Sequence, residues 1–366
     1  MKKLLYFLIL VPQICYTQIK LIEPIGHTSS VTDMSILKND MIISYGWDNS
    51  VKIWDMRTGK LLQNLTGHSS SINVMKINKK QDVLITAGSD GVLKLWNIDI
   101  GKLRYNLEGH SSSILDILLI DNDTKMISSS IDGDMKLWDL TSGYLISELN
   151  GHNKAVKSMI LSKDEKTLFT YSRDNSIKIW NLQEGVLVHS LDGHSKYIND
   201  MILSNDEQVI ISCSDDFTIK VWNVDSGALI QELKKHSEKV NGIVLSNKER
   251  NLISFSDDNS ILIWDLLKGE LIYSLIDHTE NVKGVLVDED KLFSFSDDNT
   301  IKIWDINKGE LLKDILAHSK TIRDIKLIKN LNYLVSLSLD NTIKVWDSEK
   351  LNLLFSFEGN ESYIKG

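Results

Sequence analysis

Tryptophan recurs along the chain at a nearly fixed interval, and this interval constrains the fold more than any other feature. Successive members of the series lie 42 residues apart, with one interval of 40, and Trp47 alone lies outside the series. Histidine follows the same interval, with His189 outside the series. Self-similarity at such a period indicates one structural unit copied along the chain rather than two unrelated domains. The two series are Trp54, Trp96, Trp138, Trp180, Trp222, Trp264, Trp304 and Trp346, and His27, His68, His110, His152, His194, His236, His278 and His318.

Each unit holds four short apolar segments, which one unit illustrates. The segments at residues 72–77, 83–87, 92–96 and 103–107 are rich in β-branched residues, partly alternate in polarity, and are separated by Asp, Asn, Gly and Ser. Such segments are typical of antiparallel strands joined by tight turns. A period of about 40 to 45 residues with four strands in each unit predicts a β-propeller. We therefore expect an all-β protein, a single eight-bladed β-propeller whose blades are four-stranded antiparallel sheets.

The units also carry motifs that resemble a known family. A Gly-His pair ending at His68, then Thr86, Asp90 and finally Trp96 make up one unit that resembles the WD-repeat (WD40) β-propeller family. The resemblance covers about residues 19–358 and recurs in all eight units.

This resemblance implies a hydrogen-bonded tetrad in every blade. Its members are the His, a Ser or Thr of the second strand, the Asp of the next turn and the Trp. All four residue types are present in every unit, so we expect eight filled tetrads. The hydroxyl residues are Ser44, Thr86, Ser128, Thr170, Ser212, Ser254, Ser294 and Ser336. The turn aspartates are Asp48, Asp90, Asp132, Asp174, Asp216, Asp258, Asp298 and Asp340.

Catalytic and metal-binding interpretations of these residues are weak. A catalytic triad of Ser, His and Asp is needed once, whereas this set recurs in every unit, so blade architecture accounts for it. Histidines about 42 residues apart lie on different blades, far from the close spacing of zinc ligands. We therefore predict no catalytic residue, no metal and no cofactor. Cys213, on a predicted second strand, is expected to be a small buried apolar residue.

The family resemblance places binding on one rim of the ring. The positions that reach this rim are the residue before each turn Asp and the residues at the start of each first strand. The first set is Trp47, Ser89, Ile131, Arg173, Asp215, Asp257, Asp297 and Leu339. The second set is Thr32, Asn73, Leu115, Lys157, Asn199, Asn241, Lys283 and Arg323, with Tyr197 two residues before Asn199.

Rim positions vary in type while the tetrads repeat, and this contrast favours recognition of a partner. Aromatic and arginine side chains are the usual anchors of interfaces. The predicted contact residues are Trp47, Arg173, Tyr197 and Arg323, followed by Leu115, Ile131, Lys157, Lys283 and Leu339. In a closed ring, Trp47 of the first blade is expected near Leu339 and Arg323 of the last. The three rim aspartates of consecutive blades are expected to form a negative arc opposite.

Charge and the first residues suggest where the protein acts. The formal charge of −9 argues against a general nucleic-acid binder, which normally presents a basic face. Residues 1–17 combine a Lys-Lys start, an apolar run at 4–11 and a polar end, the layout of a signal peptide too short to span a bilayer. We predict that residues 18–366 form the propeller, without a membrane span after cleavage.

The resulting interpretation is a monomeric, non-catalytic scaffold that binds a protein or peptide. We expect it to be exported, and the composition rich in Lys, Asn and Ile, with the short Lys-Lys start, favours a bacterial periplasm or envelope as its location. Two alternatives are an intracellular, cytoplasmic WD-repeat scaffold and a propeller enzyme with an unrecognised central site.

Closure of the ring is the least determined part of the fold. Residues 19–25 and 351–357 both resemble an outer strand, and only one of them is needed. Pro24 restricts its own segment to a sheet edge because proline cannot donate to a ladder. We expect residues 351–357 to complete the eighth blade. Residues 359–364 resemble the start of a further unit such as residues 193–198.

Overall fold

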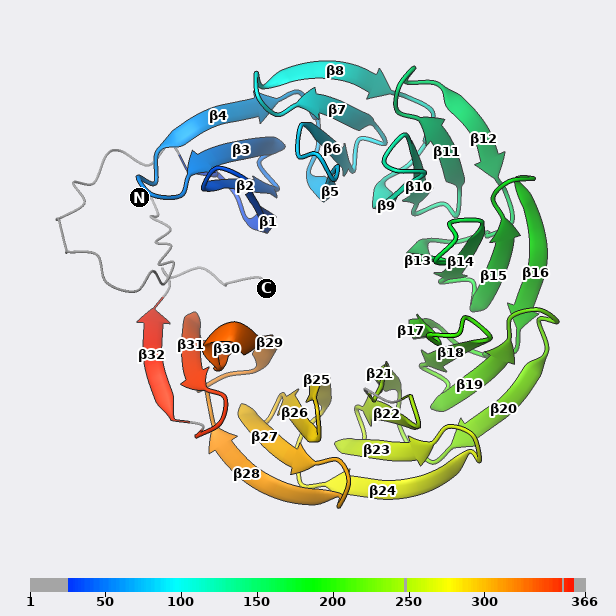
Figure 1. The fold of residues 1–366 in the computed structure, drawn as a ribbon, viewed down its shortest axis with the longest axis vertical. Coiled ribbons are helices and arrows are strands. Elements are labelled where there is room, and N and C mark those ends of the chain that lie inside the picture. Colours follow the sequence, from blue (N-terminus) through cyan, green and yellow to red (C-terminus); the bar gives the residue numbers. More distant parts are fainter. Residues whose placement is uncertain (1–25, 247–248, 351, 359–366) are drawn as a thin grey trace.

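The computed structural model describes residues 26–246, 249–350 and 352–358, which form a ring of small sheets around an open centre (Figure 1). The predicted fold class is confirmed, because these residues form eight sheets of four antiparallel strands each. One short 3-10 turn, Lys329–Leu331, is the only helical element among them. The predicted signal peptide lies outside the described residues.

Each blade consists of four consecutive strands. Blade 1 holds β1 (Val31–Leu37), β2 (Met41–Gly46), β3 (Ser50–Asp55) and β4 (Leu61–Thr66), and blade 2 holds β5 (Ile72–Ile77), β6 (Val83–Gly88), β7 (Leu93–Asn97) and β8 (Lys102–Leu107). Blade 3 holds β9 (Ile114–Ile120), β10 (Lys125–Ser130), β11 (Met135–Asp139) and β12 (Leu145–Leu149), and blade 4 holds β13 (Val156–Leu161), β14 (Thr167–Ser172), β15 (Ser176–Asn181) and β16 (Val186–Asp192). Blade 5 holds β17 (Ile198–Leu203), β18 (Val209–Ser214), β19 (Thr218–Asn223) and β20 (Leu229–Lys234), and blade 6 holds β21 (Val240–Leu245), β22 (Asn251–Ser256), β23 (Ser260–Asp265) and β24 (Glu270–Ile276). Blade 7 holds β25 (Val282–Asp288), β26 (Lys291–Ser296), β27 (Thr300–Asp305) and β28 (Glu310–Leu316), and blade 8 holds β29 (Ile322–Ile328), β30 (Tyr333–Ser338), β31 (Thr342–Asp347) and β32 (Leu353–Glu358).

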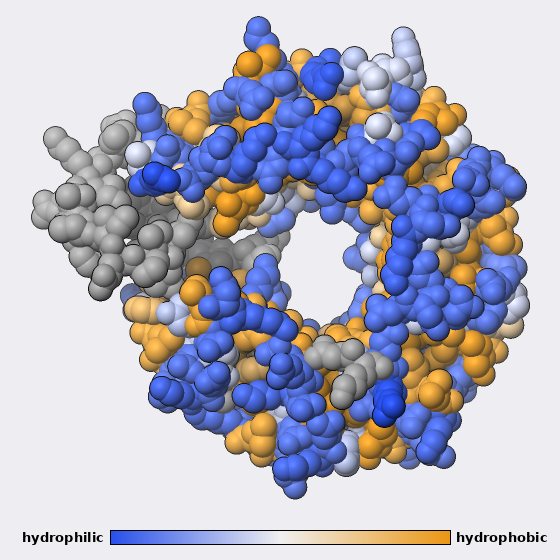
Figure 2. Space-filling model, viewed as in Figure 1, coloured by the Kyte–Doolittle hydropathy of each residue, from blue (hydrophilic) through white to orange (hydrophobic). Residues whose placement is uncertain are grey.

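The first strand of each blade lies beside the centre and the fourth lies at the circumference (Figure 1). The two middle strands are buried on both faces, which explains why β14 and β15 read as nearly continuous runs of apolar and hydroxyl residues. The fourth strand is largely exposed, and β20 buries only one side chain. Figure 2 accordingly shows a hydrophilic surface around the central opening and apolar patches along the circumference.

The C-terminal strand completes blade 8, as predicted. β32 pairs antiparallel with β31, so the last blade has the same strand order as the other seven. No strand of a described blade comes from a distant part of the chain. The competing segment at residues 19–25 and the unit-like segment at residues 359–364 lie outside the described residues.

Apolar side chains between neighbouring blades form the core. In one cluster, Phe169, Ile177 and Leu191 of blade 4 pack with Ile198 and Trp222 of blade 5. Burial of an aliphatic side chain of this size stabilises the folded state by roughly 1.5 to 3 kcal/mol before entropy is counted. Seven such clusters of described residues join blades 1 to 8 in sequence, and none of them joins blade 8 to blade 1.

Candidate binding rim

The tetrad of blade 2 shows how each blade is held. The Nδ1 atom of His68 lies 2.8 Å from the carboxylate of Asp90, and its Nε2 lies 2.8 Å from the hydroxyl of Thr86. The Trp96 indole N–H donates to the same hydroxyl over 2.9 Å. Asp90 also accepts a hydrogen bond from the backbone N–H of Ser69. Four segments of the blade are thereby joined through one buried network.

Chemistry fixes the direction of every proton in this network. An indole N–H can only donate and a carboxylate can only accept. The hydroxyl of Thr86 must then donate to Nε2 of His68, whose Nδ1–H donates to Asp90. Burial lowers the pKa of His68 against the opposing effect of Asp90, so the ring is neutral at pH 7. Burial raises the pKa of Asp90, but the hydrogen bond and charge of His68, together with the backbone hydrogen bonds from Val92 and Ser69, outweigh it and the net shift is downward.

The same contacts recur around the ring with one exception. In all eight blades the histidine Nε2 lies 2.6 to 2.9 Å from the hydroxyl, and the tryptophan N–H donates to that hydroxyl over 2.8 to 3.0 Å. In seven blades Nδ1 lies 2.7 to 3.0 Å from the turn aspartate. The exception is blade 3, where the buried Nδ1 of His110 has no partner within the described residues. The expectation of eight filled tetrads is wrong for this one link.

Blade 3 differs from the other blades in the residue two positions after the turn aspartate. In blade 4 this residue is Ser176, whose hydroxyl donates to Asp174 over 2.7 Å. In blade 3 it is Asp134, and no other blade places an acid there. The lack of a side-chain donor is not enough to break the link, because Val92 holds this position in blade 2 and His68 still reaches Asp90. Asp132 accepts hydrogen bonds from the hydroxyl of Ser111 and the backbone N–H of Asp134.

A second hydrogen bond, made by the backbone, repeats at the turn between the two middle strands. The N–H of the residue before each turn aspartate donates to the carbonyl of the residue that precedes the first strand, over 2.9 to 3.1 Å in every blade. We call these eight donors the corner residues. They are Trp47, Ser89, Ile131, Arg173, Asp215, Asp257, Asp297 and Leu339.

A β-bulge occupies the start of every first strand. The register against the second strand skips one residue there, so that residue is left out of the ladder in each blade. Bulges of this kind redirect a side chain. The skipped residues are Thr32, Asn73, Leu115, Lys157, Asn199, Asn241, Lys283 and Arg323, the predicted first-strand set. We call the corner residues, these bulge residues and Tyr197, whose carbonyl accepts the hydrogen bond of the corner residue Asp215, together the corner rim.

Comparisons with known proteins agree with this frame. Residues 146–355 match the family model described as the NWD2 C-terminal beta-propeller, and residues 25–222 match that of the Nucleolar protein 10-like N-terminal domain. Each match spans more than half of the chain. The chain belongs to the WD-repeat β-propeller family.

Among solved structures, the computationally designed Ika8 protein resembles this WD-repeat propeller. It is 28% identical, the alignment covers 88% of this chain and 98% of the designed one, and the TM-score is 0.68. No curated protein matches the chain.

Several rim side chains of this WD-repeat propeller connect neighbouring blades. Asn199 donates from its amide to the carbonyl of Val240 in the next blade and to Asp215, both over 2.8 Å. Asn241 makes the equivalent pair of hydrogen bonds with Val282 and Asp257. These asparagines therefore act as structural links between blades.

The expected negative arc is largely neutralised by other residues. Lys283 lies 2.9 Å from Asp297 and 4.0 Å from Asp257, and Lys239 lies 3.2 Å from Asp257. Asp215 accepts the hydrogen bond of Asn199. Lys283, a predicted contact residue, is thus engaged within the ring, and the rim aspartates of blades 6 and 7 are paired with lysines.

The remaining predicted contact residues are more open. Trp47, Ile131 and Tyr197 are 51%, 45% and 48% exposed, which is unusual for large apolar side chains. Lys157, Arg173 and Arg323 are also exposed. Leu115 and Leu339 are half-buried. No ion pair within the described part of the chain involves any of the three cations.

Blade 3 carries Leu115 and Ile131, and blade 4, which packs on it, carries Lys157 and Arg173. Apolar and basic rim residues therefore lie on adjacent blades. The expected grouping of Trp47 with Leu339 and Arg323 assumed that blade 8 packs on blade 1. No apolar cluster among the described residues joins those two blades.

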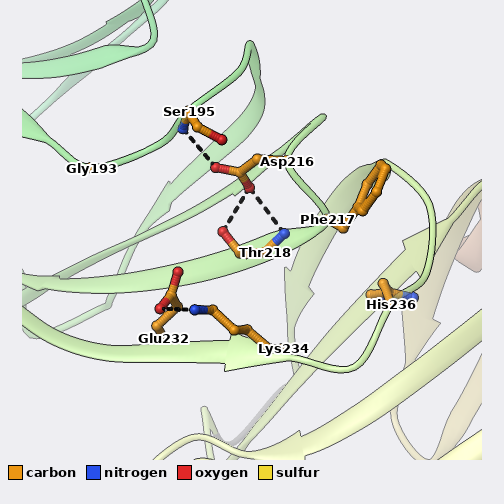
Figure 3. A pocket seen from close by; sticks show the side chains of 8 residues that line it. All are labelled: Gly193, Ser195, Asp216, Phe217, Thr218, Glu232, Lys234 and His236. Carbon is orange, nitrogen blue, oxygen red and sulfur yellow. Dashed lines mark hydrogen bonds and ion pairs between the residues drawn. The ribbon is translucent and has the colours of Figure 1, made fainter.

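A shallow hollow of about 390 Å³ lies beside blade 5 (Figure 3), and none of the predicted contact residues lines it. Its lining includes Asp216, Thr218, Glu232 and Lys234. Asp216 accepts hydrogen bonds from Thr218, and Lys234 lies 2.6 Å from Glu232. The polar groups of this hollow are therefore satisfied by one another, and we do not assign it a ligand.

Other site types find no support in the described ranges. No group of three or more His, Cys, Asp or Glu residues in them is placed to hold a metal ion. No helix of the described chain has the length and apolar character needed to cross a membrane. Cys213 is fully buried, as predicted, and burial raises the pKa of its thiol.

Proposed function

We propose that this WD-repeat propeller is a non-catalytic platform that binds a protein or peptide partner on the corner rim. The observation that carries the proposal is the contrast at the eight corners. One backbone hydrogen bond holds all of them in the same way, while their side chains range from tryptophan to aspartate. A rigid frame that presents varied side chains suits recognition.

The tetrads support the non-catalytic part of the proposal. The hydroxyls of Thr86 and Ser128 belong to residues with no exposed surface, so a substrate has no access to them. Each hydroxyl also accepts the N–H of a tryptophan, which occupies a lone pair that a nucleophile would use. Their role is to hold the blade together.

The exposed side chains of the rim define the chemistry of the partner. Arg173, Lys157 and Arg323 carry exposed positive charge, and Trp47 and Tyr197 offer exposed aromatic surface. Aromatic and arginine anchors dominate binding energy at interfaces, and complementary charge selects the partner. The expected partner is a segment with acidic side chains next to an aromatic or aliphatic residue.

Peptide binding tests this proposal directly. Fluorescence anisotropy would compare peptides that contain an aromatic residue among Asp and Glu with matched peptides that carry Lys instead. The acidic set should bind more tightly, and Trp47→Ala should raise its Kd at least about fivefold, or roughly 1 kcal/mol. Circular dichroism of this variant should remain unchanged, because Trp47 lies outside the tetrads and core clusters.

Tyr144 provides a matched control. It is 75% exposed and lies in the turn between β11 and β12, at the opposite end of β11 from the corner residue Ile131. Tyr144→Ala should leave peptide affinity unchanged. Equal weakening by both variants, or no preference for acidic peptides, would refute the proposal.

Export remains a prediction from residues 1–17. N-terminal sequencing of the mature protein from its host tests it. A chain that begins at residue 18 supports export, and a cytosolic chain that retains Met1 contradicts it.

A further inference from the structure

Each blade has one face that is turned towards the following blade. In blade 8 this face is less covered than in any other blade. The residue three positions before the repeat tryptophan has no exposed surface in blades 1 to 7, as Val51 and Ile301 show, but its counterpart Ile343 is half-buried. Val335 differs in the same way from Ile43 and the other residues at its position. Blade 8 therefore presents a partly open apolar face.

In the other seven blades, the start of the following blade covers this face. Ile198, the first residue of β17, is 3% exposed and packs against Ile177 and Leu191 of blade 4. Ile322, the first residue of β29, likewise packs against Ile301 of blade 7. An aliphatic residue at the start of each first strand of blades 2 to 8 thus seals the blade before it.

After blade 8, the sequence again has an aliphatic residue at the position where a sealing residue is expected. In each fourth strand, one apolar residue faces the core, and the sealing residue of the next blade follows it at a constant interval. Examples are Leu65 followed by Ile72 in the first pair of blades, and Ile315 followed by Ile322 in the last. The corresponding residue of β32 is Phe357, and the same interval leads to Ile364. The segment also begins with a glycine, as residues 193–198 do.

We propose that residues 359–364 dock on the open face of blade 8 and place Ile364 against Val335, Leu337 and Ile343. This segment then acts as the first part of a ninth unit that caps the last blade. Repeat arrays require such caps, because an uncovered apolar end face promotes association with other copies. This inference concerns blade 8 alone and does not depend on the function of the corner rim.

Hydrogen exchange of the full chain, read by mass spectrometry, tests the proposal. Ile364→Asp should accelerate exchange of the β30 and β31 amides at least about tenfold, because loss of the cap promotes local opening. The amides of β14 in blade 4 should be unaffected. Ile230→Asp is the matched control, because Ile230 is 56% exposed on the outer strand β20 and the same substitution should change neither region.

Three outcomes would overturn the proposal. Ile364→Asp could leave β30 and β31 unchanged. Leu21→Asp could accelerate them instead, which would make residues 19–25 the occupant. Protection of blade 8 could rise with protein concentration and be insensitive to Ile364→Asp, which would assign the face to a second copy of the chain.

Discussion

Blades 3 and 4 share one architecture but differ in one buried hydrogen bond. In blade 4, His152 reaches Thr170 through Nε2 and Asp174 through Nδ1, each over 2.8 Å. In blade 3, His110 keeps the hydroxyl contact and loses the aspartate. Both blades nevertheless have the same strand order. The comparison shows that strand pairing and apolar packing maintain the blade, while the tetrad adds a separable contribution.

The largest expected effect should be equal in the two blades. Trp138 and Trp180 are 2% and 1% exposed, and both belong to clusters between blades. Trp138→Ala and Trp180→Ala should each cost roughly 3 to 5 kcal/mol of unfolding free energy, measured by urea denaturation. Trp54→Ala in blade 1 should cost less, because Trp54 is half-buried. A much smaller loss in blade 3 would show that its tetrad also weakens the packing.

The dependence of stability on pH should distinguish blade 3 from blade 4 more clearly. Burial lowers the pKa of His110 to about 4, below the ordinary value of 6.5, and the nearby charge of Lys136 acts in the same direction. The unfolded state then binds more protons between these values, so stability is complete above pH 6.5 and falls towards pH 4. This histidine should account for a loss of roughly 2 to 3 kcal/mol between pH 7 and 4.5.

A variant of the same blade checks that assignment. Asp134→Ser removes the competing acid, which should allow His110 to donate to Asp132 and raise its pKa. The stability lost between pH 7 and 4.5 should then be smaller than in the parent chain. An identical loss in both proteins would show that other groups cause it.

The smallest expected effect is the change in unfolding free energy at neutral pH when the residues at positions 134 and 176 are exchanged between the two blades. Asp134→Ser should raise the unfolding free energy by about 1 kcal/mol, the typical net value of a buried hydrogen bond. Ser176→Asp should lower it by a similar amount, because it gives blade 4 the acid of blade 3. Urea denaturation at pH 7 measures both changes. Effects of the same sign would contradict this explanation of the two tetrads.

Much of this architecture could be predicted from the sequence. The spacing of tryptophan and histidine specifies eight units, and alternating apolar segments specify their strands. The weak tetrad also had a visible signal, because Asp134 is the only acid at a position that Ser, Thr or Val fills in the other units. We predicted a filled tetrad because residue types were counted without considering their charged neighbours.

The rim was less predictable, because its chemistry depends on contacts between blades. Asn199 and Asp257 have the sequence character of surface residues, yet one connects two blades and the other is paired with lysines. The distances between side chains of neighbouring blades depend on how the blades pack around the ring, and no local sequence pattern specifies this packing. The exposed states of Trp47 and Tyr197 agree with their predicted place on the rim, and their binding role stays a prediction.

The uninterrupted strand order within each blade has a consequence for synthesis. Every strand pair of blade 1 lies between Val31 and Thr66, so its hydrogen bonds can form as soon as this segment has left the ribosome. Each later blade adds its own sheet and covers the one before it. Pairing of this kind involves short loops and favours fast folding, and the emerging chain can fold from its amino end without waiting for its last residues.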